Sequence, residues 1–227
     1  MGHGIDFGGW RAGLMVSGLW DQDWDRNTLD RNYYLLGEDN ALEESHVYRF
    51  RQTSRDVRLG GAALAAIEIG DHHSVQSTTL LNRSAEGSTR IYQGENRDVG
   101  APIRVNRVRW IERQLYVQQL VGAHTLPFAR DLGIEWKYTH SEASRGEPDR
   151  REYRYDYEAQ ADRWYISDRP EGNGVFFSDL ADENRDTSVG VTLPVTLPWM
   201  ADGEGFLKAG WGRVNRDRRV DTRRFKY

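Results

Sequence analysis

The stretch EWKYTHSEASRGEPDRREYRYDY, which runs from Glu135 to Tyr157, changes character along its length. From Leu132 to Ser141, apolar and aromatic residues alternate with small, polar and charged ones, which is the pattern of a β-strand whose two faces meet different surroundings. Beyond about Ala143 the alternation gives way to mixed Arg and Glu, and Gly146-Glu147-Pro148 predicts a turn. We therefore predict a strand with lipid on one face and a polar lumen on the other, which leaves the membrane near Ala143.

The same period of two recurs along the chain, and no segment has the period of a helix. Each apolar face extends over about ten residues, the length of a β-strand tilted across a bilayer. The sequence thus predicts an all-β, antiparallel up-and-down transmembrane β-barrel segment. It would be a meander of about seven long strands, left open because a bacterial barrel closes with an even number. The expected strands are 11–24, 46–69, 74–93, 105–125, 131–145, 185–197 and 205–227, with 146–184 as a raised hairpin or ordered loop.

The connections between these strands are predicted to be of two kinds. Short turns follow the apolar strand ends, and long polar loops join the charged ends. This asymmetry is typical of outer-membrane barrels. The short turns are 70–73, 126–131 and 197–205; the long loops are 25–45, 93–104 and 146–184.

The phase of the alternation predicts which residues share a face. The residues expected to face lipid are Leu115, Val117, Val121, Ile134, Trp136, Tyr138, Val189, Val191, Leu193, Val195, Leu207 and Trp211. Those expected to face the lumen are Glu112, Gln114, Gln118, Glu135, Lys137, Thr139, Ser188, Thr192 and Lys208. An aromatic girdle at the membrane borders is expected from Trp20, Trp110, Phe128, Trp136, Trp199 and Trp211.

Composition excludes several classes of protein. The 227 residues include 38% hydrophobic and 29% charged residues, and the net charge is −4, so no global field favours nucleic acid. No apolar run reaches the roughly 18 residues of a transmembrane helix. The absence of cysteine excludes disulfides and thiolate metal sites. The beginning, MGHGIDFGGW, has neither the basic nor the apolar region of a signal peptide.

Three local patterns suggest metal binding or catalysis, and each has a plainer interpretation that we favour. Asp71-His72-His73 resembles a metal site but is expected in a hairpin turn. The alternating acids of DQDWDRN, from Asp21 to Asn27, lack the Gly and Glu of an EF-hand, although a loose calcium site stays open. Glu112 and Glu135 would suit a glycosidase only if paired across a cleft. We therefore expect no catalytic residue, cofactor or metal.

The arginine-rich run RVNRDRRVDTRR, from Arg213 to Arg224, has two interpretations. It could bind anions such as lipopolysaccharide phosphate. We favour cross-strand ion pairs with neighbours such as EPDRREYRYD.

Several stretches together resemble the middle barrel strands of TonB-dependent outer-membrane receptors. They are STTLLNRSAEGSTRIYQGENRDVG, RVRWIERQLYVQQLVGAHTLP, EPDRREYRYDYE, WYISDRPEGNGVFFSDLADENRD and KAGWGRVNRDRRVDTRRFKY. The resemblance begins near Phe7 and implies a barrel of roughly 22 strands, plugged by an N-terminal domain, that imports a scarce ligand with energy from the inner-membrane TonB complex. It carries over no ligand-contact residue by position.

On that resemblance, residues 1–227 would be a partial barrel domain without plug or signal peptide, located in the outer membrane of a Gram-negative bacterium. Its partners would be outer-membrane lipid, an unknown small ligand and, in the full-length protein, the plug and the TonB complex. The alternative is a soluble β-sandwich that binds or hydrolyses carbohydrate. Strand length distinguishes the two, because sandwich strands are about six residues long.

Overall fold

The computed structural model describes residues 2–169, 172–196 and 204–227. Nearly all of these residues belong to β-strands, and the described part contains one short 3₁₀ turn, η1 (Pro127–Ala129), and no α-helix. Among the described residues, no helix has the length and apolarity to span a bilayer. The strands are β1 (Gly2–Phe7), β2 (Trp10–Leu36), β3 (Leu42–Ile69), β4 (His73–Asn96), β5 (Ala101–Leu126), β6 (Leu132–Glu158), β7 (Arg163–Ile166), β8 (Gly174–Thr196) and β9 (Glu204–Lys226).

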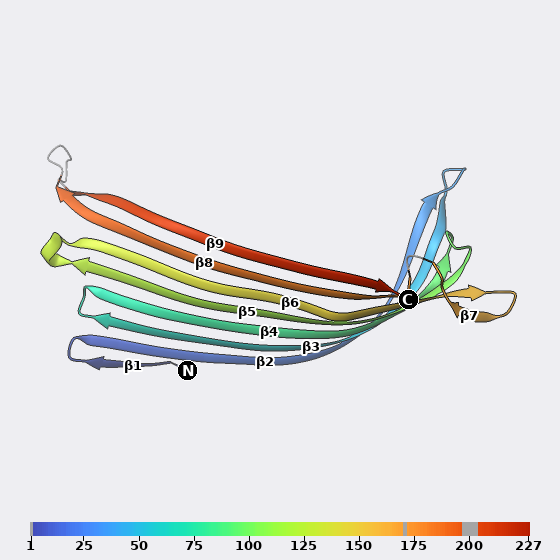
Figure 1. Cartoon of the computed structure of the whole chain (residues 1–227), viewed down its shortest axis with the longest axis horizontal. Coiled ribbons are helices and arrows are strands. Elements are labelled where there is room, and N and C mark those ends of the chain that lie inside the picture. The colour runs from blue at the N-terminus through green and yellow to red at the C-terminus, as the bar shows by residue number, and fades with distance from the viewer. Residues whose placement is uncertain (1, 170–171, 197–203) are drawn as a thin grey trace.

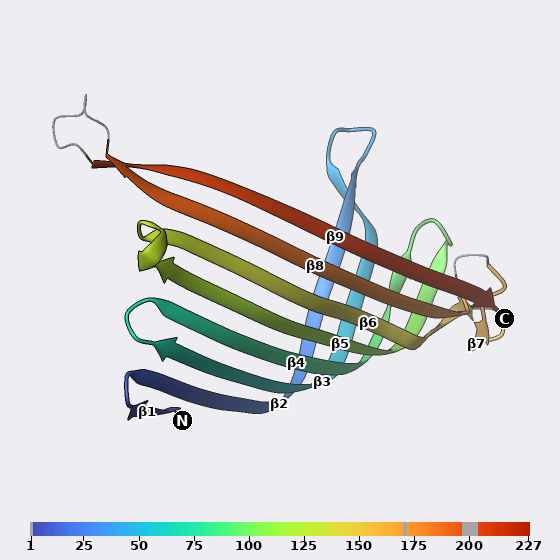
Figure 2. The same ribbon diagram turned by 60° about the vertical axis from the view of Figure 1, so that its left-hand side comes forward.

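All nine strands form one antiparallel sheet in the order β1-β2-β3-β4-β5-β6-β8-β9, with β7 paired to the end of β6. Figure 1 shows the long strands side by side, and Figure 2 shows that the sheet curves like a trough without closing. The prediction of an open, up-and-down antiparallel meander is therefore confirmed. In the described residues β9 pairs only with β8, and β1 covers only the Trp10–Met15 part of β2.

The strands are longer and more numerous than predicted. Seven of them have 23 to 28 residues, several times the usual length of about five or six. The predicted long loops at 25–45, 93–104 and 146–184 are wrong, since most of their residues belong to paired strands between β2 and β8. Beyond the apolar zone both faces are polar, so alternation disappears although the backbone still pairs. The predicted turn 197–205 falls largely outside the described residues.

Two short strands account for the difference in number from the predicted seven. β1 folds back on β2 through Gly8 and Gly9, both of which have positive φ, as a two-residue hairpin turn requires. β7 pairs with the last four residues of β6, which gives the raised hairpin expected within 146–184. Both strands are too short for their alternation to be recognised.

The predicted turn at Gly146-Glu147-Pro148 is wrong, because β6 runs straight through these residues with a bulge. Between the pairs Glu147–Ser178 and Arg150–Phe176, β6 advances three residues while β8 advances two. The pairing with β5 shows the same extra residue. Pro148, which has no N–H to donate to a ladder, lies in this bulge. One extra residue exchanges the two faces of β6. Even-numbered residues of β6 from Arg150 onward therefore share a face with its odd-numbered residues up to Glu147.

The two faces of the sheet differ in burial. Tyr48, Ile103, Val105 and Ile111 are the buried hydrophobic residues, and the register puts all four on one face. Because the sheet is a single layer, side chains bury one another only where they converge on the concave side of its curve. We call this the inner face and the opposite one the outer face.

The register confirms part of the predicted grouping and overturns the rest. Nine residues expected on the lipid side do share the outer face: Ile134, Trp136, Tyr138, Val189, Val191, Leu193, Val195, Leu207 and Trp211. Six expected in the lumen share the inner face: Glu135, Lys137, Thr139, Ser188, Thr192 and Lys208. The grouping is wrong for β5, where Leu115, Val117 and Val121 lie on the inner face and Glu112, Gln114 and Gln118 on the outer face.

The error in β5 has a local cause. Its alternation is broken on both sides, by Gln119 among the apolar residues and by Leu120 among the polar ones, so the phase relative to β6 could not be derived. Pairing places Gln118 opposite Thr79 on the outer face, where the Thr79 hydroxyl donates to the Gln118 Oε1 at 2.5 Å. Gln119 donates to Thr139 at 3.1 Å on the inner face.

Candidate functional site

The outer face carries an apolar band along the ends of the strands that meet at η1 and the other short turns. The band ends at Trp20 on β2, Leu81 on β4, Tyr138 on β6 and Trp211 on β9, where the next residue on the outer face is polar or charged. Polar residues interrupt the band at Ser77 and Thr79 on β4 and at Gln118 on β5. Trp20 belongs to a row of directly paired residues that runs across the sheet from β2 to β9. Compared with that row, the band ends two residues closer to the short turns at Leu81, six residues closer at Tyr138 and eight residues closer at Trp211. The border of the band therefore crosses the strands obliquely.

This obliqueness measures a strand tilt. From β2 to β9 the border shifts by eight residues along the strands over six strand-to-strand steps. Each step therefore shifts it by about 1.3 residues, or ~4.4 Å along the strand, for a distance of ~4.8 Å between neighbouring strands. A border parallel to a membrane then requires strands tilted by about 43°, within the range of roughly 35–45° seen in outer-membrane barrels. Side chains along the border are aromatic at Trp20, Tyr116, Tyr138 and Trp211.

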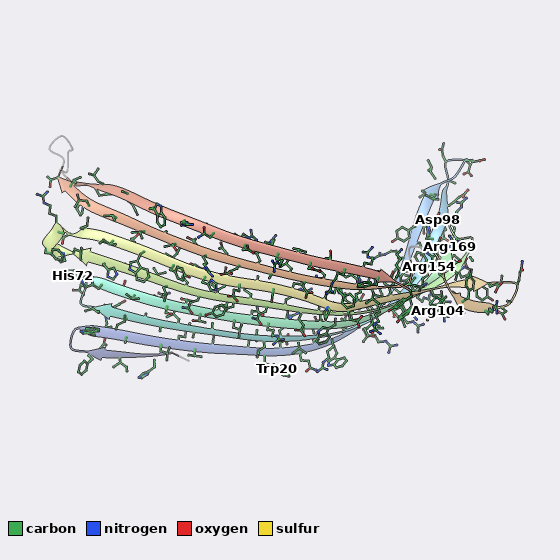
Figure 3. The ribbon with its side chains drawn as sticks, viewed as in Figure 1. Trp20, His72, Asp98, Arg104, Arg154 and Arg169 are labelled. Carbon is green, nitrogen blue, oxygen red and sulfur yellow. The ribbon has the colours of Figure 1, made fainter. Side chains whose placement is uncertain are left out.

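The predicted girdle matches this border only in part. Trp20 and Trp211 lie on it, and both are more than half exposed. Trp136 is within the band, Trp110 lies on the charged half of β5, and Phe128 is in η1 at the short-turn end. Trp199 lies outside the described residues. Figure 3 shows Trp20 projecting from β2 at the edge of the sheet.

The inner face of the charged half begins with a small apolar cluster at the tips of β3, β4 and β5. Tyr48 packs with Ile103 and Val105, and Phe50 and Tyr92 stack at 4.8 Å between ring centroids. Burial raises the pKa of Tyr92. This cluster fixes the three tips relative to one another.

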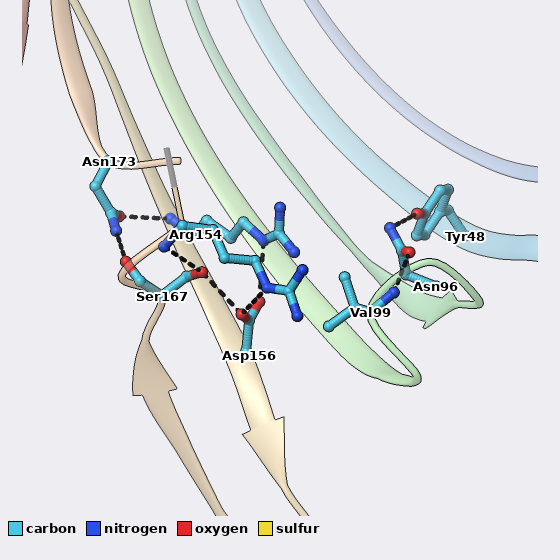
Figure 4. Close-up of polar contacts among 8 residues, drawn as sticks. Tyr48, Asn96, Val99, Arg154, Asp156, Ser167 and Asn173 are labelled. Carbon is cyan, nitrogen blue, oxygen red and sulfur yellow. Dashed lines mark hydrogen bonds and ion pairs between the residues drawn. The ribbon is translucent and has the colours of Figure 1, made fainter. Parts of the chain in front are cut away.

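A hydrogen-bonded turn completes that cluster. Asn96 Nδ2 donates to the Tyr48 hydroxyl at 2.8 Å, and the Val99 N–H donates to Asn96 Oδ1 at 3.1 Å (Figure 4). The side chain of Asn96 thereby ties the turn between β4 and β5 to β3.

A second cluster, polar and buried, fastens the β6–β7 hairpin. Asp156 is 2% exposed and accepts from Arg154 Nε at 2.9 Å and from the Ser167 hydroxyl at 2.8 Å (Figure 4). Arg169 lies 3.5 Å from the same carboxylate. Asn173 accepts from the Arg154 N–H at 2.9 Å and donates to the Ser167 carbonyl. The chain after β7 is thus held against β6.

Next to this cluster the inner face carries a belt of arginines from neighbouring strands. Arg107 is paired with Glu152 at 2.5 Å and Arg109 with Glu86 at 2.5 Å. Arg90 donates to the amide oxygen of Gln52 at 2.9 Å and forms no ion pair within the described part of the chain. Burial, with Arg107 and Arg109 nearby, lowers the pKa of Arg90.

The belt continues across the bulge of β6 to β9. Arg150 lies 3.6 Å from Glu147 and stands over the Phe176 ring at 4.2 Å. Arg224 approaches the same ring at 5.6 Å. A hollow of about 250 Å³ opens here, lined by Arg107, Arg150, Glu152, Phe176, Arg224 and Lys226 together with the backbone from Gly172 to Val175.

A larger hollow, of about 850 Å³, lies on the outer face between the tips of β2–β5 and the β6–β7 hairpin. Its charges are largely compensated: Arg49 is paired with Asp30 at 2.8 Å. Arg104 stands over the Trp164 ring at 4.4 Å. Its lining contains two arginines, Arg49 and Arg51, and two carboxylates, Asp30 and Glu95, so it carries no net charge.

At the opposite end of the molecule, three rings form a chain of hydrogen bonds on the outer face. Trp136 Nε1 donates to His124 Nε2 at 3.0 Å, and His124 Nδ1 lies 3.2 Å from His73 Nδ1. Since an indole N–H only donates, His124 Nε2 is the acceptor in the first of these contacts.

The structure separates the candidates for catalysis and metal binding. Glu112 is on the outer face and Glu135 on the inner face, so the pairing required for a glycosidase is wrong. Asp21 to Asn27 belongs to β2, where Asp21 lies 3.7 Å from Arg58. Asp71 is in the turn before β4. Among the described residues no group of three or more His, Asp or Glu side chains has the arrangement of a metal site.

The arginine run of β9 does form cross-strand ion pairs, but with a different strand from the one predicted. Arg216 and Arg218 each lie 2.5 Å from Asp182 on β8. The expected partner segment is on β6, and β8 lies between it and β9. The hydrogen bonds from these two arginines hold the pKa of Asp182 well below its usual range.

The arginine belt and the hollow were not found by sequence analysis, although a signal was present. In RREYRYDYE, charged residues at 150, 152, 154 and 156 alternate with Arg151 and three tyrosines. That alternation marks an inward-facing charged side, which the structure has just above the bulge.

Comparison of the sequence with family models and with curated proteins, and of the structure with solved structures, found no match.

Proposed function

We propose that this chain is part of the barrel of an outer-membrane transport protein, of the TonB-dependent receptor kind that its sequence resembles. The apolar band of the outer face meets the lipid of a Gram-negative outer membrane. The inner face lines the passage, and its arginine belt meets the ligand on the external side. In the whole receptor a plug domain and the TonB complex are the further partners. The role is transport rather than catalysis.

One observation carries the proposal: the apolar band has an oblique border lined by Trp20, Tyr116, Tyr138 and Trp211. A soluble protein has no reason to end its apolar residues along a line inclined at about 43° to the strand axes. A bilayer imposes this line, because the border must be parallel to the membrane while the strands tilt. Aromatic side chains are favoured at that level because their rings are amphipathic.

The single layer also favours a barrel over the soluble β-sandwich. A sandwich buries its apolar faces between two sheets about 10 Å apart. The described residues form one sheet, and its apolar outer face is exposed, with Leu14, Val16 and Leu207 all more than half accessible. An apolar surface of this extent requires a partner, and lipid is the one that matches its shape.

Single-cysteine labelling tests the proposal, because the natural sequence contains no cysteine and each introduced thiol is unique. The chain is refolded with phosphatidylcholine vesicles and collected by flotation. Cysteines at Val189, Val191 and Leu193 should carry a dye that brominated lipid quenches, and should resist a membrane-impermeant maleimide. The neighbours Ser188 and Thr192, on the inner face, should show the opposite behaviour.

The matched control uses the charged half of the same strands. Cysteines at Arg213 and Asn215, beyond the border at Trp211, should escape the lipid quencher although they share the outer face. Equal quenching at all positions, or a chain that stays in the aqueous fraction as a monomer, would refute the membrane assignment.

A further inference from the structure

The cations around Phe176 are not balanced by the carboxylates beside them. Arg107 is neutralised by Glu152 at 2.5 Å, and Arg150 has only the more distant Glu147 at 3.6 Å. Arg224 forms no ion pair with any residue that the structure describes, and Lys226 lines the same hollow. A local excess of positive charge is therefore held together on one small area of the inner face.

Two features hold these cations in place despite their mutual repulsion. The Phe176 ring lies under both guanidinium groups, at 4.2 Å from Arg150 and 5.6 Å from Arg224. Cation–π contact orients a guanidinium while leaving its N–H groups available. Burial lowers the pKa of Arg150, which reflects the cost of charge at a partly desolvated site.

Arg154 lies beside the hollow without lining it and is also incompletely paired. Gly172 lines the hollow and lies against the side chain of Arg154, whose Nη2 is buried without a hydrogen-bond partner among the described residues. A buried N–H without an acceptor is unfavourable. An anion in the hollow itself would contact Arg150 and Arg224, which line it, and would relieve the repulsion between them.

We propose that this hollow is a subsite for a multiply charged oxyanion, a phosphate or polycarboxylate group carried by a soluble ligand. The planar donors of Arg150 and Arg224 suit the paired oxygens of such a group. The volume of about 250 Å³ accommodates one such group rather than a whole large ligand. The inference rests on the proposed transport function, to which it adds the chemical class of the ligand.

The position of the subsite selects a soluble source for the anion. Arg150 and Arg224 project from the inner face, whereas a lipid headgroup would approach the outer face. Their immediate neighbours, Arg151 and Arg223, project from that outer face and have carboxylates beside them, Asp149 at 2.9 Å and Asp221 at 3.6 Å. These neighbours provide a matched control on the same two strands.

Titration calorimetry with inorganic pyrophosphate tests the subsite on the vesicle-bound chain, in about 150 mM salt to screen diffuse attraction. Arg150→Gln and Arg224→Gln should each weaken binding about tenfold or more, as expected for the loss of a charge-assisted hydrogen bond. Arg151→Gln and Arg223→Gln should leave binding within about twofold of the unmodified chain. Arg150→Lys, which keeps the charge but loses the planar donor pair, should give an intermediate value.

Three outcomes would overturn the subsite: no binding by the unmodified chain, an equal loss in all four glutamine variants, or competition by added phosphatidylglycerol, which would make a headgroup the ligand. Flotation and far-UV circular dichroism of every variant separate misfolding from lost binding. A chain that floats but does not bind refutes the subsite and leaves the transport proposal standing. A chain that binds pyrophosphate but stays in water refutes transport and retains the anion site.

Discussion

A charge introduced at Val191 should weaken membrane assembly. Val191 lies on the outer face of β8, paired with Ile134 and Ala209. It is five residues from the end of the strand at Thr196, or about 16 Å along a strand with ~3.3 Å per residue. With a tilt near 45° this becomes ~12 Å of depth from the short-turn end, whereas the border row, in which Trp211 pairs with Val189, is only two residues away on the other side. Val191→Arg therefore puts a cation inside the apolar band but nearer its charged border, at a cost of about 1–3 kcal/mol, between the midplane and interface values.

The assay is the urea dependence of the vesicle-bound fraction, read by tryptophan fluorescence. Thr192→Arg is the control, since Thr192 is the next residue and lies on the inner face opposite Lys208. It should cost about 1 kcal/mol or less, the size of a repulsion between paired residues on adjacent strands. Equal costs for the two variants would refute the assignment of the faces, and a negligible cost for Val191→Arg would refute the placement of the band.

Three further outcomes are expected. Asp156→Ala should cost about 3–5 kcal/mol, because it leaves a buried arginine unpaired, and should increase tryptic cleavage after Arg163 in the β6–β7 hairpin, whereas Asp149→Ala, at an exposed ion pair, should leave the cleavage rate nearly unchanged. Two β9 arginines hold the pKa of Asp182 below its unfolded value of 3.8, so the contribution of Asp182 to stability is complete above that pH and is lost as the pH falls below about 4. Asp182→Asn should therefore make the free energy of unfolding less dependent on pH in this acid range, and an unchanged pH dependence would contradict this. In water without lipid the isolated chain should associate into large species through its exposed outer face and the unpaired edge of β9, and light scattering that gives a monodisperse monomer would contradict the edge argument.

Local pattern was sufficient wherever each strand alternates strictly. The period of two from Leu132 to Ser141, and again along β8 and β9, identified strands and grouped Trp136, Val191 and Lys208 on their observed faces. Side-chain direction in a strand follows from position parity alone, so no knowledge of neighbours is needed. The all-β class, the antiparallel meander and the short turns at the apolar ends follow from the same information.

The sequence pattern did not identify the charged halves of the strands as strand. Where both faces are polar, alternation disappears, and residues such as Arg31 or Arg104 look like loop. Only pairing with adjacent strands shows that the backbone stays extended there. The inner core around Tyr48, and the hydrogen bonds by which Ser167 and Asn173 hold β6, join segments that no sequence pattern relates.

Register was decided by the tertiary structure alone. A single extra residue at Pro148 exchanges the two faces of β6, and the broken alternation of β5 left the phase of Leu115 and Gln114 undetermined. Both depend on which residue of one strand is opposite which residue of another, and that is set by the summed hydrogen bonds and side-chain contacts along the whole ladder. The arginines around Phe176 gather from β5, β6 and β9 for the same reason: sequence determined that each strand would be extended and amphipathic, whereas only the ladder determined which side chains meet.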